Sequence, residues 1–72
     1  MEKELQIIDK VWKEIKARRI ENMKYYKGKG DDENLADERI CLAVTRDTLN
    51  AVIMELTHNK QYLEEIDYFK LV

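Results

Sequence analysis

Proline is missing from this 72-residue chain, and glycine occurs only twice. This scarcity excludes a collagen-like repeat, a proline-rich ligand segment and a flexible glycine-rich linker. Cysteine and histidine occur once each, so the chain has no internal disulfide and lacks the residues of a cysteine- or histidine-based metal site. We therefore expect one small domain over residues 1–72 that holds no metal and no cofactor.

Side chains for catalysis are also scarce. Cys41 and His58 belong to no nucleophile or triad pattern, and we expect Cys41 to be a small buried hydrophobe and His58 a solvated residue at a helix end. The segment from Lys27 to Gly30 lacks the spacing, the Lys-Ser/Thr pair and the preceding strand of a phosphate-binding loop. A chain this short also has little material for a closed pocket, so we predict a protein that is not an enzyme.

Long apolar runs are absent as well. The longest, Ile40 to Val44, is far shorter than the ~20 residues of a membrane span. The first residues, Met1-Glu2-Lys3-Glu4, lack the charged and then apolar profile of a signal peptide. These features predict a cytoplasmic protein without a membrane partner.

Residues 1–27 show the periodicity of an amphipathic helix, which Gly28 is expected to end. One side of this helix follows a coiled-coil register, in which apolar positions give way to polar ones toward the end. These residues are the predicted interface with a second copy or another partner: Leu5, Ile8, Trp12, Ile15, Arg19, Asn22 and Tyr26.

Arg19 lies in the middle of this apolar side, where an unpaired guanidinium would be costly. Two arrangements would satisfy it. It pairs either with an acid from residues 31–38 or 64–67 of its own chain, or across a dimer seam, together with Asn22, as a polar residue that sets the register.

The second half of the chain predicts a mixture of helix and strand. A polar connector at 28–34 leads into an acidic half, 35–72. Within it we expect a strand at 39–44, a helix capped by Thr45 and ending near His58, one further turn capped by Asn59 through Leu63 and Glu65, and a strand at 67–72. The predicted fold is α+β, and two copies would join their short strands into a four-stranded sheet covered by the long helices.

A seven-residue repeat of leucine supports a different fold. Leucine recurs at 35, 42, 49, 56 and 63, as in a helical zipper, although the companion positions are not consistently apolar. A helix over residues 35–58 in an all-α dimer is therefore the alternative to the strand prediction.

Charge is unevenly divided, with a formal net charge of +4 in residues 1–30 and −6 in residues 31–72. This asymmetry favours docking of one half on the other, or binding of a charged partner. Basic and aromatic residues alternate around Tyr25 and Tyr26, as in surfaces that bind nucleic acid. The candidate contacts are Lys10, Lys13, Lys24, Lys27 and Lys29.

The Lys/Glu-rich first helix, the presence of Asn and Tyr in place of Pro and Gly, and the lack of a chemistry motif make the chain similar to small orphan proteins of Gram-positive bacteriophages and prophages. That resemblance covers the whole chain, assigns no functional residue and implies a regulatory or host-takeover role. From the residues we predict a small regulatory protein that acts by protein–protein binding as a homodimer. The alternatives are a nucleic-acid-binding regulator and an acidic inhibitor that uses residues 31–38 and 64–67.

Overall fold

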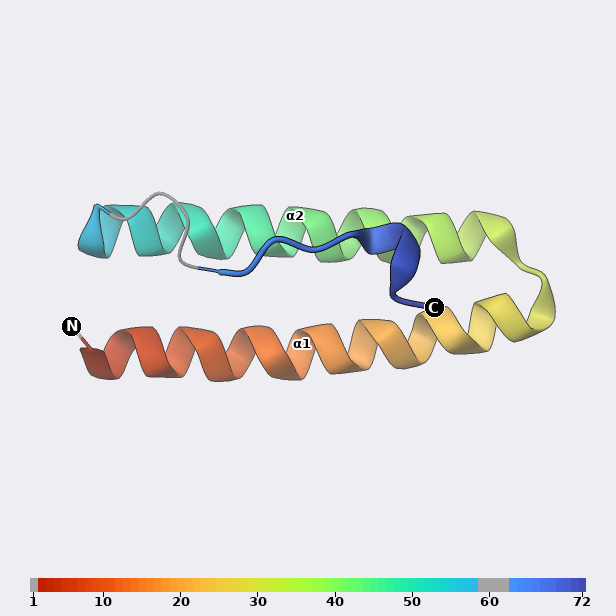
Figure 1. The fold of residues 1–72 in the computed structure, drawn as a ribbon, viewed down its shortest axis with the longest axis horizontal. Helices are drawn as coiled ribbons and strands as arrows, with labels where there is room; N and C mark the ends of the chain where they lie inside the picture. Colours follow the sequence, from red (N-terminus) through yellow and green to blue (C-terminus); the bar gives the residue numbers. More distant parts are fainter. Residues whose placement is uncertain (1, 59–62) are drawn as a thin grey trace.

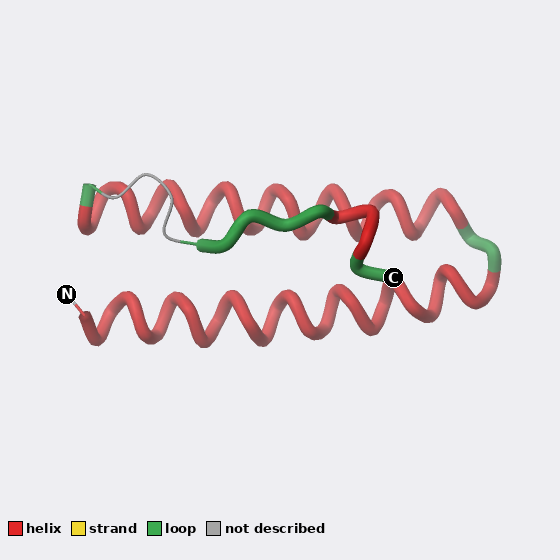
Figure 2. Tube along the Cα trace, viewed as in Figure 1, coloured by secondary structure: helices red, strands yellow, loops and turns green. Residues whose placement is uncertain are grey.

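The chain folds as a hairpin of two long helices with a C-terminal tail laid along it (Figure 1). The computed structural model describes residues 2–58 and 63–72. Helix α1 spans Glu2–Lys29, α2 spans Asp32–Thr57, and a single 3-10 turn, η1, spans Tyr68–Lys70. The described residues contain no strand, as Figure 2 shows by the absence of yellow.

The predicted α+β fold is therefore wrong, and so is the four-stranded sheet that depended on it. Residues 39–44 lie within α2, where Leu42 is fully buried while Ile40 and Val44 are 60% and 59% exposed. A strand would have turned all three side chains to the same face. The alternative of a helix over residues 35–58 is confirmed, whereas the all-α dimer stays a prediction. The leucine repeat was the signal for this helix: Leu35 and Leu42 are buried and Leu49 packs against the core, although Leu56 is 37% exposed.

The predicted terminal strand at 67–72 is wrong as well, because this segment contains η1 and pairs with no strand in the described part of the chain. Asp67 begins the turn, and its side chain accepts a hydrogen bond from the backbone N–H of Phe69 at 3.1 Å. Leu63 and Glu65, which were expected to lie in one further helical turn, are non-helical, and Asn59, the predicted cap of that turn, lies outside the described residues.

A tight connection joins the helices where a polar connector was expected. The helix continues through Gly28, contrary to the prediction, and the chain reverses at Gly30, whose φ of 70° is a left-handed conformation that favours glycine. Asp31 then caps α2 by accepting a hydrogen bond from the backbone N–H of Asn34 at 3.2 Å. Three acidic residues close to this helix start suit the positive end of its dipole.

The later boundaries of α2 were predicted with mixed success. Thr45 caps no helix, because it lies inside α2 and its hydroxyl donates to the carbonyl of Cys41 at 2.8 Å. The end of the helix is where the sequence predicted it, as His58 takes the left-handed cap conformation and is exposed.

All three parts of the chain contribute to the core. α1 supplies Trp12 and Met23, α2 supplies Leu35, Leu42 and Ile53, and the tail supplies Leu63. The tail runs back from the end of α2 and its C-terminus lies over α1, in front of the helix pair in the view of Figure 1. The hairpin is therefore covered on one of its two broad faces. Neither long helix of the described segments has an apolar stretch that could cross a membrane.

Candidate functional site

The predicted interface side of α1 faces α2 of the same chain. Trp12 is buried, and Leu5, Ile8 and Tyr26 pack against the core cluster. Ile15 is half-buried. The apolar stripe that suggested a dimer seam is thus largely used within one copy, so any surface for a partner has to be sought elsewhere.

Arg19 and Asn22 are satisfied inside the chain by one carboxylate. The Arg19 guanidinium donates to both oxygens of Glu38, at 3.1 and 3.3 Å, and the Asn22 amide donates to Oε1 at 3.4 Å. Glu38 lies in the first part of α2 and its side chain is only 13% exposed. Of the two arrangements predicted for Arg19, the structure thus has the pair with an acid from residues 31–38. Because an unpaired buried charge is costly, this cluster favours the register in which Glu38 lies beside Arg19 and Asn22.

The five lysines proposed as nucleic-acid contacts are all exposed, but acids and a ring accompany several of them. Lys13 lies 2.8 Å from Asp9, and Lys24 lies 3.7 Å from Glu21. Lys29 sits over the ring of Tyr25 at 4.8 Å. The remaining two of the five lysines, Lys10 and Lys27, are also exposed. Nearby acids offset the field that would attract phosphates, so the arrangement gives no specific support to nucleic-acid binding.

The acidic segments also have internal partners. Glu38 binds Arg19, Glu64 binds Lys16, and Asp31 and Asp67 cap helical turns. These contacts occupy much of the negative charge that an inhibitor would present to a basic groove. Among residues 2–58 and 63–72, no three acidic, cysteine or histidine side chains come together as a metal site would require.

The tail is held in its groove by side chains of α2 that bind its main chain. Arg46 donates from Nε to the carbonyl of Glu64 at 2.7 Å and from Nη2 to the carbonyl of Leu63 at 3.1 Å. Asn50 accepts a hydrogen bond from the N–H of Leu63 at 3.2 Å, and Arg39 donates to the carbonyl of Tyr68 at 3.2 Å. These α2 residues therefore mark one side of the helix as the wall of a peptide groove.

Helix α1 forms the opposite wall of the same groove. Lys16 Nζ lies 2.6 Å from Oε1 of Glu64. The hydrogen bond and the positive charge of Lys16 lower the pKa of Glu64 below its ordinary value of 4.5. The ion pair is largely exposed, so it orients the tail more than it stabilises the fold.

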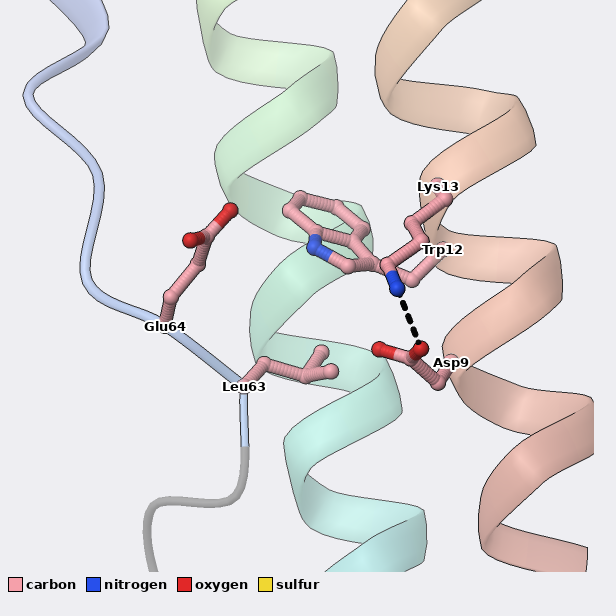
Figure 3. A pocket seen from close by; sticks show the side chains of 5 residues that line it. All are labelled: Asp9, Trp12, Lys13, Leu63 and Glu64. Carbon is pink, nitrogen blue, oxygen red and sulfur yellow. Dashed lines mark ion pairs between the residues drawn. The ribbon is translucent and has the colours of Figure 1, made fainter.

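A cavity of about 340 Å³ remains between α1 and the start of the tail, lined by Asp9, Trp12, Lys13, Leu63 and Glu64. Figure 3 shows the indole nitrogen of Trp12 turned toward the tail side of this cavity. The Trp12 side chain is buried, yet its Nε1 has no hydrogen-bond partner among residues 2–58 and 63–72. An unpaired buried donor costs about 1–3 kcal/mol, so the tail is an imperfect filling for this end of the groove.

The broad face opposite the tail carries exposed apolar side chains of both helices. Arg39, Arg46 and Asn50 mark the side of α2 that binds the tail. Each residue of an α-helix is rotated by about 100° from the one before it, so the sequence of α2 gives the residues on the opposite side. We call this surface the open face. Its exposed apolar members are Ile7, Val11 and Tyr25 of α1 and Cys41, Val44, Val52 and Leu56 of α2, and the same spacing places Thr48 and the charged, exposed Arg18, Asp37 and Glu55 among them.

Cys41 belongs to this surface, and the expectation that it is buried is wrong. The prediction assumed that an apolar run would be covered on both sides. In the structure the run Ile40 to Val44 wraps around a helix, so only Leu42 reaches the core.

Sequence reasoning therefore missed both the groove and the open face. The groove had no signal of its own, because Arg39, Arg46 and Asn50 resemble ordinary solvated residues until the tail is in place. The open face had one: apolar residues at Val44, Val52 and Leu56 exceed what a single buried stripe requires.

Comparison with known proteins adds no relative, since no family model, no curated protein and no solved structure matches the chain.

Proposed function

We propose that this chain is a non-enzymatic regulatory protein that works by protein–protein binding as a homodimer, and that two copies pair through the open face. The observation that carries the proposal is the set of large apolar side chains exposed there, of which Val52 is 44% and Val44 59% exposed. Contiguous exposed apolar surface marks interaction sites in soluble proteins.

The size of the face fits a dimer. The molecule measures 42 × 17 × 15 Å, so a broad face has a projected area of roughly 700 Å², which is of the same order as the ~800 Å² of accessible surface that each partner buries in a standard interface. Because the tail occupies the other broad face, an isologous pair would stack two hairpins as a four-helix bundle with a tail on each outer side.

The single thiol provides a direct test. Cys41 lies on the open face and is the only cysteine of the chain, so a thiol reagent such as iodoacetamide reports on one position. We expect the rate constant for alkylation to fall as the protein concentration rises, because pairing covers the thiol. A rate constant that does not depend on concentration would reject the dimer.

Two charged variants of α2 localise the interface. Val52 and Met54 are similarly exposed, at 44% and 40%, but they lie on different sides of the helix. Val52→Glu should make alkylation of Cys41 fast at every concentration, because a carboxylate would be buried between the copies. Met54→Glu should behave like the wild type. If both variants act alike, the open face is not the interface.

A further inference from the structure

We infer that the groove between α1 and α2 is a binding site for an extended acidic peptide of a partner protein, and that the C-terminal segment, residues 63–72, is its intramolecular competitor. The inference concerns the face opposite the dimer surface and does not depend on dimerisation. Four kinds of observation support it: the main-chain contacts, the apolar contacts, the charges and the imperfect fit near Trp12.

The hydrogen bonds from α2 to the tail go to its backbone. Arg39, Arg46 and Asn50 direct all four of their hydrogen bonds with the tail at main-chain carbonyl or N–H groups. Every peptide carries these groups, as in strand addition to a sheet edge, where main-chain bonds give affinity and side-chain pockets give specificity. The donors and the acceptor would therefore serve another extended chain equally well.

Arg46 is the clearest case. Its side chain is only 13% exposed, and the carboxylate of Asp47 is as far as 4.0 Å away. The close partners of this charge are the carbonyls of Leu63 and Glu64. A largely buried guanidinium needs hydrogen-bond acceptors, and here the tail supplies them. Arg46 could therefore donate in the same way to the carbonyls of another peptide in the groove.

The tail itself shows which peptide fits. Leu63 is buried, and Ile66 and Tyr68 pack against the core, which sets the spacing of the apolar anchors. Of the acids between them, Glu64 pairs with Lys16 of the groove wall, whereas the carboxylate of Asp67 lies beside Lys70 of the tail itself. Arg39 and Arg46 add positive charge to the walls of the same groove. The partner segment should therefore combine apolar anchors at this spacing with an acid directly after the first anchor.

A partner peptide could make a hydrogen bond to Trp12 that residues 63–72 do not make. The cavity beside the indole, and the lack of a partner for Nε1 in the described part of the chain, indicate that residues 63–72 do not complete this end of the groove. A peptide that extends past the position of Leu63 and places a carbonyl or carboxylate oxygen there would accept the indole N–H. It could then displace a competitor that has the benefit of being tethered.

A synthetic peptide of residues 63–72, labelled with fluorescein, tests the groove against the full-length protein. In the full-length double variant Leu63→Asp/Ile66→Asp the tail cannot bury its anchors, while every residue of the two helical walls is retained. We expect fluorescence anisotropy to give a Kd at least tenfold lower for this variant than for the wild type, because a tethered competitor acts at an effective concentration near millimolar. Equal Kd values for the two proteins, or no binding to the variant, would overturn the inference.

Two arginine substitutions, each added to the double variant Leu63→Asp/Ile66→Asp, test where the peptide binds. Arg46→Ala should raise the Kd at least tenfold, because it removes two main-chain hydrogen bonds. Arg18→Ala, on the exposed side of α1 away from the tail, should leave it unchanged. A peptide with Asp in place of both anchors should not bind. If Arg46→Ala has no more effect than Arg18→Ala, the peptide binds elsewhere and the inference fails.

Circular dichroism checks that the double variant keeps its helices. If the double variant loses its helices, the single variant Leu63→Ala replaces it. The expected Kd of the peptide for Leu63→Ala is lower than for the wild type, and a Kd equal to that of the wild type would contradict the inference. Val52→Glu on the open face should leave peptide binding unchanged, so failure of the groove and failure of the dimer give different results.

Discussion

Alanine substitution at three neighbouring positions of α2 distinguishes the helix from the predicted strand. Leu42 is fully buried in the core, whereas Ile40 and Val44 are mostly exposed. Removing a buried leucine side chain costs about 2–5 kcal/mol, through lost burial and the cavity left behind. At the two exposed sites the loss of contacts is small and alanine is the better helix former, so Ile40→Ala and Val44→Ala should stay within about 0.5 kcal/mol of the wild type.

Urea unfolding followed by far-ultraviolet circular dichroism measures these differences. The experiment belongs at low protein concentration, so that pairing through the open face does not contribute to the stability of Val44 variants. A chain of this size has only about 4–11 kcal/mol of stability, and Leu42→Val offers a milder version of the core change. Should Ile40→Ala and Val44→Ala destabilise the protein as much as Leu42→Ala, all three side chains would be buried and the helical assignment would be refuted.

Three further outcomes are expected. Gly30→Ala should destabilise the protein by about 1 kcal/mol in urea unfolding, because Gly30 has positive φ, whereas Gly28→Ala, inside α1 with open space around it, should stabilise it by up to about 1 kcal/mol. Glu38→Gln should lower the melting temperature, since Arg19 loses its charged partner, and a matched Glu55→Gln, at an exposed position in the last part of α2, should not. Folding lowers the pKa of Glu64, so its ion pair with Lys16 stabilises the docked tail at pH values above the pKa of the unfolded chain. This stabilisation is lost as the pH falls through the pKa of the folded protein. Trp12 fluorescence should therefore report loosening of the tail below about pH 4.5, and an unchanged signal in that range would contradict this prediction.

The first helix could be predicted from sequence because one strong periodicity governs it. Residues 1–27 were expected to be helical and α1 spans Glu2–Lys29. The helical periodicity also placed Arg19 correctly among apolar neighbours. The cost of burying its charge predicted either a carboxylate from residues 31–38 or 64–67 or a partner across a dimer seam, and the structure has Glu38. Charge asymmetry between the halves suggested that one docks on the other, as the two helices do.

The second half was misjudged because its apolar residues were assumed to be buried. In α2, Ile40 and Val44 are exposed, so the apolar run has no single helical stripe and resembles a strand. The tail alternates as a strand does, but its backbone groups are satisfied by Arg39, Arg46 and Asn50 rather than by a neighbouring strand. Nothing in a local pattern distinguishes these two kinds of partner, since both require only an extended chain with apolar residues on one side.

The mass of the protein in solution tests the proposed homodimer most directly. Sedimentation equilibrium over micromolar to millimolar concentrations should show the apparent mass rising from 8.7 kDa toward twice that value for the wild type and for Met54→Glu. Val52→Glu should remain at 8.7 kDa throughout. A wild-type protein that stays at the mass of one chain at every concentration would contradict pairing through the open face.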